Sequence, residues 1–256
     1  MEKLTIRQIE EKMKTIESED DPFLHSIKQD DRKGVQQVLA KWHSRMLFQK
    51  KIHEKHKEMT RYERQYRSRG FECIAGIDEV GRGPLAGPVV AAAVILPEDF
   101  YLPGLDDSKK VPERKREEYF DMINTKAVAV SVGIIEPAEI DRINIFEATK
   151  KAMLSAIEGL NPKPDFLLVD AVKLLTPYPM EAIIKGDGKS VTIAAASIIA
   201  KVTRDRMMAE IGKEFPRYGF GKNMGYGTKE HLEAISIHGI TPYHRKSFAP
   251  IKDSYN

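Results

Sequence analysis

The stretch Ile74-Ala-Gly-Ile-Asp-Glu-Val-Gly-Arg-Gly-Pro-Leu-Ala-Gly-Pro88 places two adjacent acids, Asp78 and Glu79, at the end of an apolar run. A desolvated carboxylate without compensation is costly, so acids that leave a buried strand usually hold cations, share a proton or meet an arginine. Glycine lets backbone N–H groups approach another molecule, and Arg82 between two glycines is placed to meet an anion such as a phosphate. The alternative for an isolated copy of this pattern is a plain turn after a strand.

Outward from this stretch, apolar runs alternate with helical patterns. Strand candidates lie at residues 73–78, 88–96, 128–135, 166–170 and 181–185, separated by glycine or proline turns and helical patterns. Helical patterns lie at residues 112–125, 137–159 and 190–213. The first three strands are close enough in sequence for antiparallel pairing. The order predicts a mixed α/β domain over residues 71–256.

Residues 1–70 form a separate segment with two amphipathic patterns. Apolar residues recur at helical spacing over residues 6–16 and again over residues 35–46. Asp20-Asp21-Pro22 breaks the first pattern, and Ser68-Arg69-Gly70 ends the segment. We therefore expect a helical N-terminal extension with a boundary near residue 70.

The charge of the chain is uneven. Residues 1–70 carry 17 Lys and Arg against 12 acids, whereas the remainder carries 24 against 26. Residues 32–70 alone hold 12 basic and 3 acidic residues. Such a stripe either binds a polyanion or is the solvated face of a helix.

The composition is that of a globular protein: 41% of the 256 residues are apolar and 31% are charged. The longest apolar run, residues 89–96, is far shorter than the roughly 20 residues that span a bilayer, and the amino terminus is charged rather than signal-like. We expect a cytoplasmic protein. A single cysteine, Cys73, excludes an internal disulfide and a multi-cysteine zinc site.

Two further acids share the placement of the first pair. Asp170 ends the run Phe166-Leu-Leu-Val-Asp170, and Asp187 precedes an alanine-rich helical pattern. Functional groups commonly collect at strand ends in α/β sheets, so these acids are expected to converge. Clustered carboxylates need neutralising cations, and all-oxygen ligands suit Mg²⁺ or Mn²⁺. Two such ions would activate water and stabilise a leaving oxygen, which predicts phosphodiester hydrolysis.

Competing motifs fit less well. Gly188-Lys189-Ser190 matches the end of a nucleotide-binding phosphate loop, but that loop needs glycine where this chain has Ile183. His53 and His56 lie in a lysine-rich helical pattern without a third ligand, which is typical of a solvated face.

A series of separated motifs runs from about residue 72 to the carboxyl terminus. They are Gly76-Ile-Asp-Glu-Val-Gly-Arg-Gly-Pro-Leu-Ala-Gly-Pro88, Asp107-Ser-Lys109, Leu168-Val-Asp170, Lys185-Gly-Asp187, Ile193-Ala-Ala-Ala-Ser-Ile-Ile-Ala-Lys-Val-Thr-Arg-Asp205, Gly225-Tyr-Gly-Thr228 and His244-Arg-Lys-Ser-Phe248. Together they closely resemble bacterial ribonuclease HII, a type 2 ribonuclease H, with no departure at the acidic positions.

The resemblance implies a ribonuclease H-like fold, with a five-stranded mixed sheet flanked by helices and a C-terminal helical region that contacts substrate. It carries the metal-binding, catalytic acids onto Asp78, Glu79, Asp170 and Asp187. It also implies endonucleolytic cleavage of RNA in RNA/DNA hybrids and 5′ to single ribonucleotides in duplex DNA, leaving 3′-hydroxyl and 5′-phosphate ends.

The resemblance further assigns recognition of the ribose 2′-hydroxyl, which DNA lacks, to Gly81, Arg82 and Gly83. It assigns packing against the deoxyribose on the 3′ side to Tyr226, for which the alternative is a core aromatic. A separate hypothesis from the residues gives Lys109, Arg142 and Asn144 phosphate contacts, although each could equally be a surface residue or a helix cap.

Alternatives stay open at this level. A type 3 ribonuclease H would prefer continuous hybrids, and a non-catalytic junction binder would lack the acids. The extension could be a nucleic-acid clamp that uses its basic residues with Trp42, Tyr62 and Tyr66, a docking module for a replication or repair protein, or a solubilising helical hairpin.

Overall fold

The computed structural model describes residues 4–255. The chain divides into two compact units, with the division between Lys57 and Glu58.

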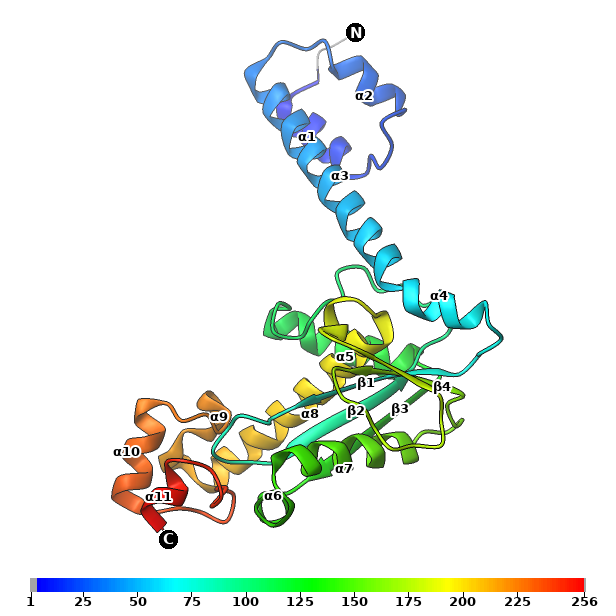
Figure 1. Ribbon diagram of the computed structural model, residues 1–256. Helices are drawn as coiled ribbons and strands as arrows, with labels where there is room; N and C mark the ends of the chain where they lie inside the picture. Colours follow the sequence, from blue (N-terminus) through cyan, green and yellow to red (C-terminus); the bar gives the residue numbers. More distant parts are fainter. Residues whose placement is uncertain (1–3, 256) are drawn as a thin grey trace. The chain divides into compact units, whose positions relative to one another are not determined.

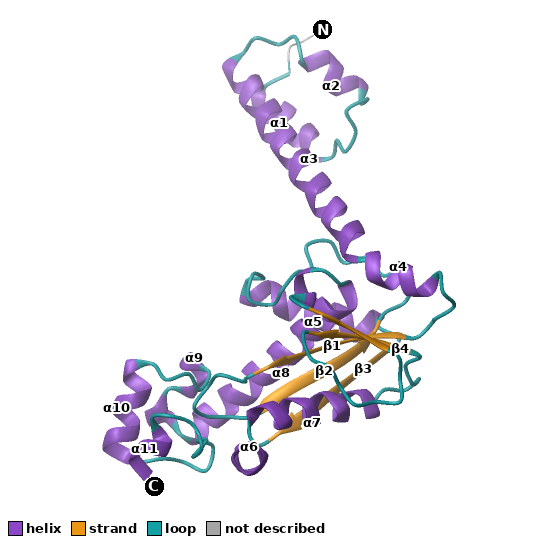
Figure 2. Ribbon diagram, viewed as in Figure 1, coloured by secondary structure: helices purple, strands orange, loops and turns teal. Residues whose placement is uncertain are grey.

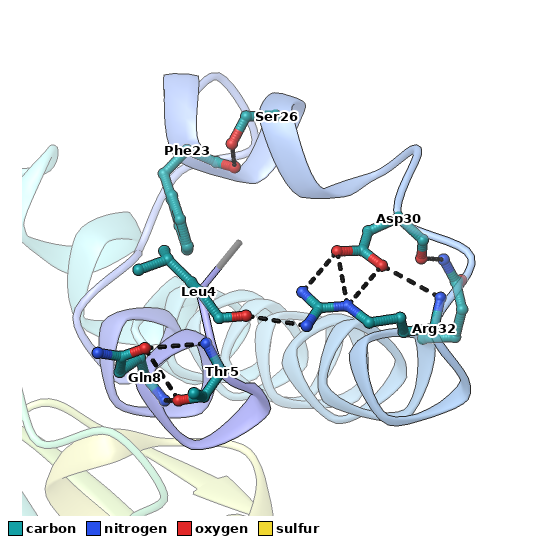
Figure 3. A network of polar contacts seen from close by, with 8 residues as sticks. Leu4, Thr5, Gln8, Phe23, Ser26, Asp30 and Arg32 are labelled. Atoms are coloured by element: carbon teal, nitrogen blue, oxygen red, sulfur yellow. Dashed lines mark hydrogen bonds and ion pairs between the residues drawn. The ribbon is translucent and has the colours of Figure 1, made fainter. Parts of the chain in front are cut away.

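The first unit is helical, as the sequence predicts. It contains α1 (Ile6–Lys14), α2 (Pro22–Ile27) and most of α3 (Lys33–Met59), packed around Ile9, Leu24, Val35 and Trp42. Polar contacts fix its ends. Thr5 and Gln8 form a reciprocal cap on α1, and the Arg32 guanidinium bonds both the Asp30 carboxylate and the Leu4 carbonyl (Figure 3). The segment that ends at Pro22, which the sequence predicts to break the first helical pattern, also begins α2. Asp21 caps this helix, and proline is tolerated in a first helical turn.

The second unit is built on a five-stranded mixed sheet of order β3-β2-β1-β4-β5, which confirms the predicted fold class (Figure 2). Its strands are β1 (Ile74–Val80), β2 (Val89–Ile95), β3 (Ala129–Ile135), β4 (Phe166–Asp170) and β5 (Met180–Ile183). The first three pair antiparallel, as predicted from their short connections. β4 joins β1 in parallel, and β5 joins β4 in parallel.

Helices cover both faces of this sheet. Alternate residues of β2 pack against α8 (Val191–Glu214) and α5 (Glu113–Lys126), and the others against α7 (Ile145–Glu158). The approach of α8 requires glycine in β1, because a Cβ on Gly76 would lie 2.1 Å from the carbonyl carbon of Thr192. The single helix expected at 137–159 is two, since Asn144, with φ 69°, separates α6 (Pro137–Ile143) from α7.

The C-terminal region adds η2 (Pro216–Tyr218), α9 (Phe220–Asn223), α10 (Lys229–His238) and α11 (Ile251–Tyr255), which follow α8 along the chain (Figure 1). These helices share a cluster with Ala86 and Met208. None of the helices within residues 4–255 has the length and apolar character needed to cross a membrane.

The structural division lies earlier in the chain than the expected boundary near residue 70. The difference is α4 (Arg61–Arg67), which belongs to the second unit. Its Tyr66 ring stacks on Phe166 with centroids 3.7 Å apart. The turn at Gly70, with φ 95°, follows the end of α4, and the chain on both sides of it belongs to the second unit.

Candidate active site

Two of the predicted acids lie where neighbouring parallel strands approach one edge of the sheet. Ile77 of β1 pairs with Val169 of β4, so the residues that follow them, Asp78 and Asp170, lie side by side. Adjacent strands are about 4.8 Å apart, and residues in register point to the same face. The topology therefore brings these two carboxylates together although 91 residues separate them in sequence.

The first acid pair is buried and poorly compensated. Asp78 is 5% exposed, and burial, followed by the charges of Glu79 and Asp170, raises its pKa well above the ordinary value. Burial also raises the pKa of Glu79, against the opposing effect of Arg82, whose guanidinium lies 3.4 Å from Glu79 Oε1. Glu79 Oε2 is buried without a hydrogen-bond partner. The protein alone does not balance this negative charge.

Asp187 joins the site through the short turn η1 (Gly186–Gly188). The Gly186 N–H donates to Asp170 Oδ1 at 2.7 Å, which fixes the turn to the end of β4. Burial raises the pKa of Asp187, and the charges of Asp107 and Asp170 raise it further. The structure thus places the Asp187 turn beside Asp170.

The loop before α5 lies against the same turn. A Cβ on Gly188 would be 3.8 Å from Lys110 Nζ, and the charge of Lys109 lowers the pKa of Asp187. Lys109 is exposed, so its ammonium group is free to meet a phosphate at this edge.

The chemistry of the donors fits divalent cations, but the ligands are not preassembled. Carboxylate oxygens suit Mg²⁺ or Mn²⁺, and both the unpartnered Glu79 Oε2 and the raised pKa values of Asp78, Glu79 and Asp187 fit an added positive charge. Among residues 4–255, however, no three His, Cys, Asp or Glu side chains are gathered closely enough to hold a metal ion. The metal role of the four acids therefore stays a prediction, supported by charge and burial.

Two buried arginines hold the glycine-rich loop that follows β1. Arg245 donates to the carbonyls of Gly81, Arg82 and Gly87 at 2.5 to 3.0 Å. Arg204 donates to the carbonyls of residues 86, 88 and 224. Glycine is required at position 81, because φ is 93° and a Cβ would lie 2.3 Å from Arg204 Nε. The N–H groups of residues 82 and 83 have no hydrogen-bond partner within residues 4–255, so they can serve a ligand.

Tyr226 lies over this loop. A Cβ on Gly83 would be 3.7 Å from Tyr226 Cε1, and the tyrosine is 50% exposed. Its backbone is fixed, since the Tyr226 N–H donates to the Asn223 carbonyl and the Tyr226 carbonyl is 2.8 Å from His231 Nδ1. The structure therefore has an accessible ring at this position and not a core aromatic.

Arg142 and Asn144 have structural partners. Arg142 forms two 2.7 Å hydrogen bonds with the Glu139 carboxylate. Asn144 caps α7 by accepting from the N–H groups of Phe146 and Glu147. Both residues follow β3, which runs parallel to β1, so they lie toward the same sheet edge as the acids. A phosphate contact from either one stays a prediction.

Part of the proposed basic clamp is structural. Trp42 is 2% exposed, and its Nε1 donates to the Ile16 carbonyl. Tyr66 is buried in the second unit, and Arg45 donates to carbonyls at the end of α1. The idea that Trp42 and Tyr66 interleave the basic residues for binding nucleic acid is wrong, because buried rings cannot stack on a base.

The sequence did not assign roles to several groups that shape the site. Asp107, Arg204 and Arg245 stood in the quoted motifs, but only the fold shows what they contact. Ser197 Oγ on α8 lies 2.9 Å from Ser108 Oγ, and a hydrogen bond from Ser197 lowers the pKa of Asp78. The Ser197 and Ser108 hydroxyls are 89 positions apart in sequence, and no local pattern could have matched them.

Comparison with known proteins identifies the family of the chain. The family model "Ribonuclease HII" matches residues 75–251, and "Ribonuclease HII N-terminal domain" matches residues 5–67. The chain is 58% identical over 253 residues to a ribonuclease HII of Bacillus cereus, covering 99% of this chain and 98% of that protein. The ribonuclease HII of Bacillus thuringiensis strain Al Hakam gives the same identity and coverage.

Solved structures show the same fold. Ribonuclease H2 from Pyrococcus horikoshii OT3 superposes with a TM-score of 0.59 at 27% identity, covering 70% of this chain and 95% of that one. The ribonuclease HII in a PCNA complex from Archaeoglobus fulgidus gives 0.59 at 28% identity, covering 69% and 95%. A ribonuclease HIII in complex with Mn²⁺ gives 0.56 at 18% identity, covering 72% and 69%, which concerns the fold alone. The chain belongs to the ribonuclease HII family of metal-dependent ribonucleases H.

Proposed function

We propose that the protein is an endoribonuclease that cleaves RNA in RNA/DNA hybrids and cuts 5′ to single ribonucleotides in duplex DNA, leaving 3′-hydroxyl and 5′-phosphate ends. The observation that carries this proposal is the continuity of β1 with the loop that follows it. The strand that presents Asp78 and Glu79 runs directly into residues 81–83, over which the half-exposed Tyr226 lies. A sugar held between this loop and the tyrosine would lie beside the acids.

Each group has a physical task in this proposal. The partner-free N–H groups of residues 82 and 83 are donors for a ribose 2′-hydroxyl, which distinguishes RNA from DNA. Tyr226 offers an apolar ring against which the next deoxyribose packs. Lys109, Arg142 and Asn144 are candidates for phosphate contacts that set the register of the duplex.

Asp78, Glu79, Asp170 and Asp187 would hold the divalent cations, Mg²⁺ or Mn²⁺, and two ions suit the number of carboxylates. Bound cations of this kind activate water and neutralise charge on a phosphodiester. The buried Asp78 and Glu79 carboxylates would remain ionised in that state, since an opposite charge lowers a raised pKa. Asp170, anchored by the Gly186 N–H, keeps one oxygen oriented.

The test is cleavage of a labelled DNA duplex with one ribonucleotide, in Mg²⁺ and in Mn²⁺, with an all-DNA duplex and a continuous hybrid in parallel. We expect a cut 5′ to the ribose that is absent with Asp78→Asn. Cleavage of the hybrid alone would favour the type 3 activity, and binding without any cut would favour a junction-binding protein.

The extension is proposed to contact a partner. The Archaeoglobus fulgidus relative was solved in complex with PCNA, which supports a replication or repair protein as a partner, and residues 1–70 are the predicted contact. Exposed lysines 50 and 51 on α3 support the alternative, a direct contact with nucleic-acid phosphates.

A further inference from the structure

Glu63 is a buried carboxylate that the site described above does not use. It lies on α4 and is 4% exposed. Its Oε1 accepts hydrogen bonds from Ser190 Oγ at 2.6 Å, the Thr192 N–H at 3.1 Å and Thr192 Oγ1 at 2.8 Å. All these donors belong to the first turn of α8 or to its cap residue.

This first turn depends on Glu63. The first N–H groups of a helix have no partner within the helix, and buried donors must find an acceptor. Ser190 serves one of them by accepting from the Ile193 N–H, and Glu63 serves another at Thr192. A carboxylate is also favoured at this end of a helix by the backbone dipoles.

The same turn is joined directly to the acids. The Ser190 N–H donates to the Gly186 carbonyl at 2.8 Å, and the Gly186 N–H donates to Asp170 Oδ1 at 2.7 Å. Asp187 lies in the chain between Gly186 and Ser190, the two residues that these hydrogen bonds hold. Hydrogen bonds therefore run without interruption from Glu63 through Ser190 and Gly186 to Asp170.

Other contacts hold α4 in place. Tyr66 stacks on Phe166 and donates to Glu181 Oε2 at 2.5 Å. Residues 5–67 match the N-terminal family model, whereas the catalytic family model begins at residue 75. The acidic site thus takes one of its supports from the N-terminal segment.

We propose that Glu63 is a positioning residue for cleavage, which fixes the first turn of α8 and through it the turn that carries Asp187. The inference rests on the proposed metal-dependent cleavage. Loss of the Glu63 carboxylate would leave the buried donors at Ser190 and Thr192 without this acceptor. The turn that carries Asp187 would then shift, and a small displacement of a catalytic group lowers the rate strongly.

The first test is steady-state cleavage by Glu63→Met, which keeps a side chain of similar length but removes the oxygen that accepts all three hydrogen bonds. We expect kcat to fall roughly 10- to 100-fold, as for other groups that orient metal ligands, with KM for the duplex changed less than about twofold. Thr192→Val, which removes one of the three hydrogen bonds, should lower kcat less. Glu72→Met, which removes an exposed carboxylate from the same unit, is the matched control and should behave as the wild type.

The second test is calorimetric titration of each full-length protein with Mn²⁺, together with its melting temperature. We expect weaker Mn²⁺ binding by Glu63→Met in protein that is fully folded at the assay temperature. Unchanged kcat and Mn²⁺ affinity would overturn the inference, as would a loss of activity explained by the unfolded fraction alone. If the wild type cleaves neither substrate, the proposed function fails, and equal or weaker Mn²⁺ binding by the variant still decides the role of Glu63.

Discussion

At the scale of single residues, the site combines buried acids, which destabilise the fold, with an exposed ring that adds little to its stability. Asp78 and Glu79 are buried with raised pKa values, and Glu79 Oε2 has no partner. Tyr226 keeps half its surface exposed beside Gly83. Neither arrangement is needed to build the core, which is typical of residues retained for function.

Asp78→Asn tests the first group. Removing a buried charge of raised pKa should stabilise the metal-free protein at pH 7 by about 1 kcal/mol while cleavage falls at least about 10²- to 10³-fold. Scanning calorimetry and the cleavage assay check both effects, with exposed Asp121→Asn as the control. A lower melting temperature would instead show that Asp78 supports the fold.

Substitutions of Tyr226 test the role of the exposed ring. Tyr226→Ala should lower kcat/KM on the single-ribonucleotide duplex roughly 5- to 100-fold, the range expected when stacking on an aromatic ring is lost. Tyr226→Phe should retain most activity, because the ring remains. Since the side chain is half exposed, the melting temperature should hold within about 2 °C. An unaffected Tyr226→Ala enzyme would argue against sugar packing.

At the scale of elements, the loop after β1 is positioned by the C-terminal region. Arg245 and Arg204 bond its carbonyls, and burial lowers the pKa of Arg245 to about 9, which still leaves it charged at neutral pH. The Arg245 side chain has no carboxylate partner within residues 4–255. Hydrogen bonds to backbone carbonyls therefore replace the water that this charge lost on burial. The position of residues 81–83, for which we propose substrate recognition, therefore depends on packing of the C-terminal region.

Arg245→Lys should separate charge from geometry. Lysine keeps the positive charge, but it cannot reproduce the four hydrogen bonds of the planar guanidinium, so we expect a loss of about 2 to 3 kcal/mol in unfolding free energy. Urea denaturation measures this loss, and exposed Arg206→Lys is the matched control. Equal stability of the two variants would contradict the assigned role.

A buried histidine pair fixes the Tyr226 turn. His244 Nδ1 accepts from the Thr241 N–H, so its Nε2–H donates to His231 Nε2 at 3.0 Å, and His231 Nδ1–H donates to the Tyr226 carbonyl. Both rings are neutral in this arrangement. Burial lowers the pKa of His231, and burial together with His231 lowers the pKa of His244 to about 4.

This pair predicts the direction of a pH effect. Because the folded pKa of His244 is below the unfolded value of 6.5, the unfolded chain binds more protons between about pH 6.5 and 4. The stability that neutral His244 contributes is thus fully present above pH 6.5. The free energy of unfolding should fall by roughly 2 to 3 kcal/mol as the pH drops to 4. Urea denaturation should show that the deficit of His244→Gln shrinks with acidification. A constant deficit would contradict the shift.

At the scale of the whole molecule, the chain has two units with separate cores. The first packs around Trp42 and Leu24, and the second around the sheet. The second unit includes α4, with Glu63 and Tyr66 among its buried residues.

Truncation at two positions tests this organisation. A chain of residues 58–256 should fold and cleave, whereas a chain beginning at residue 71 should be less stable because it lacks Glu63 and Tyr66. If α3 contacts phosphates, the 58–256 chain should also show a shallower dependence of log affinity on log salt, by about 0.9 for each lost contact on B-DNA. An unchanged slope would reject the clamp.

The sequence by itself determined the strand order along the chain and the mixed α/β class, and it predicts the four acids as the site, because apolar periodicity and acids at strand ends are local patterns. The same patterns gave a boundary near residue 70 and one helix at 137–159, since they record where a helix stops but not what it packs against. Only the tertiary structure decided that Asp78 lies beside Asp170, that Arg245 holds the loop of Gly81, and that Glu63 supports the Asp187 turn. These relations join residues 92 to 164 positions apart, and they arise from strand pairing and burial, which act between segments distant in the chain.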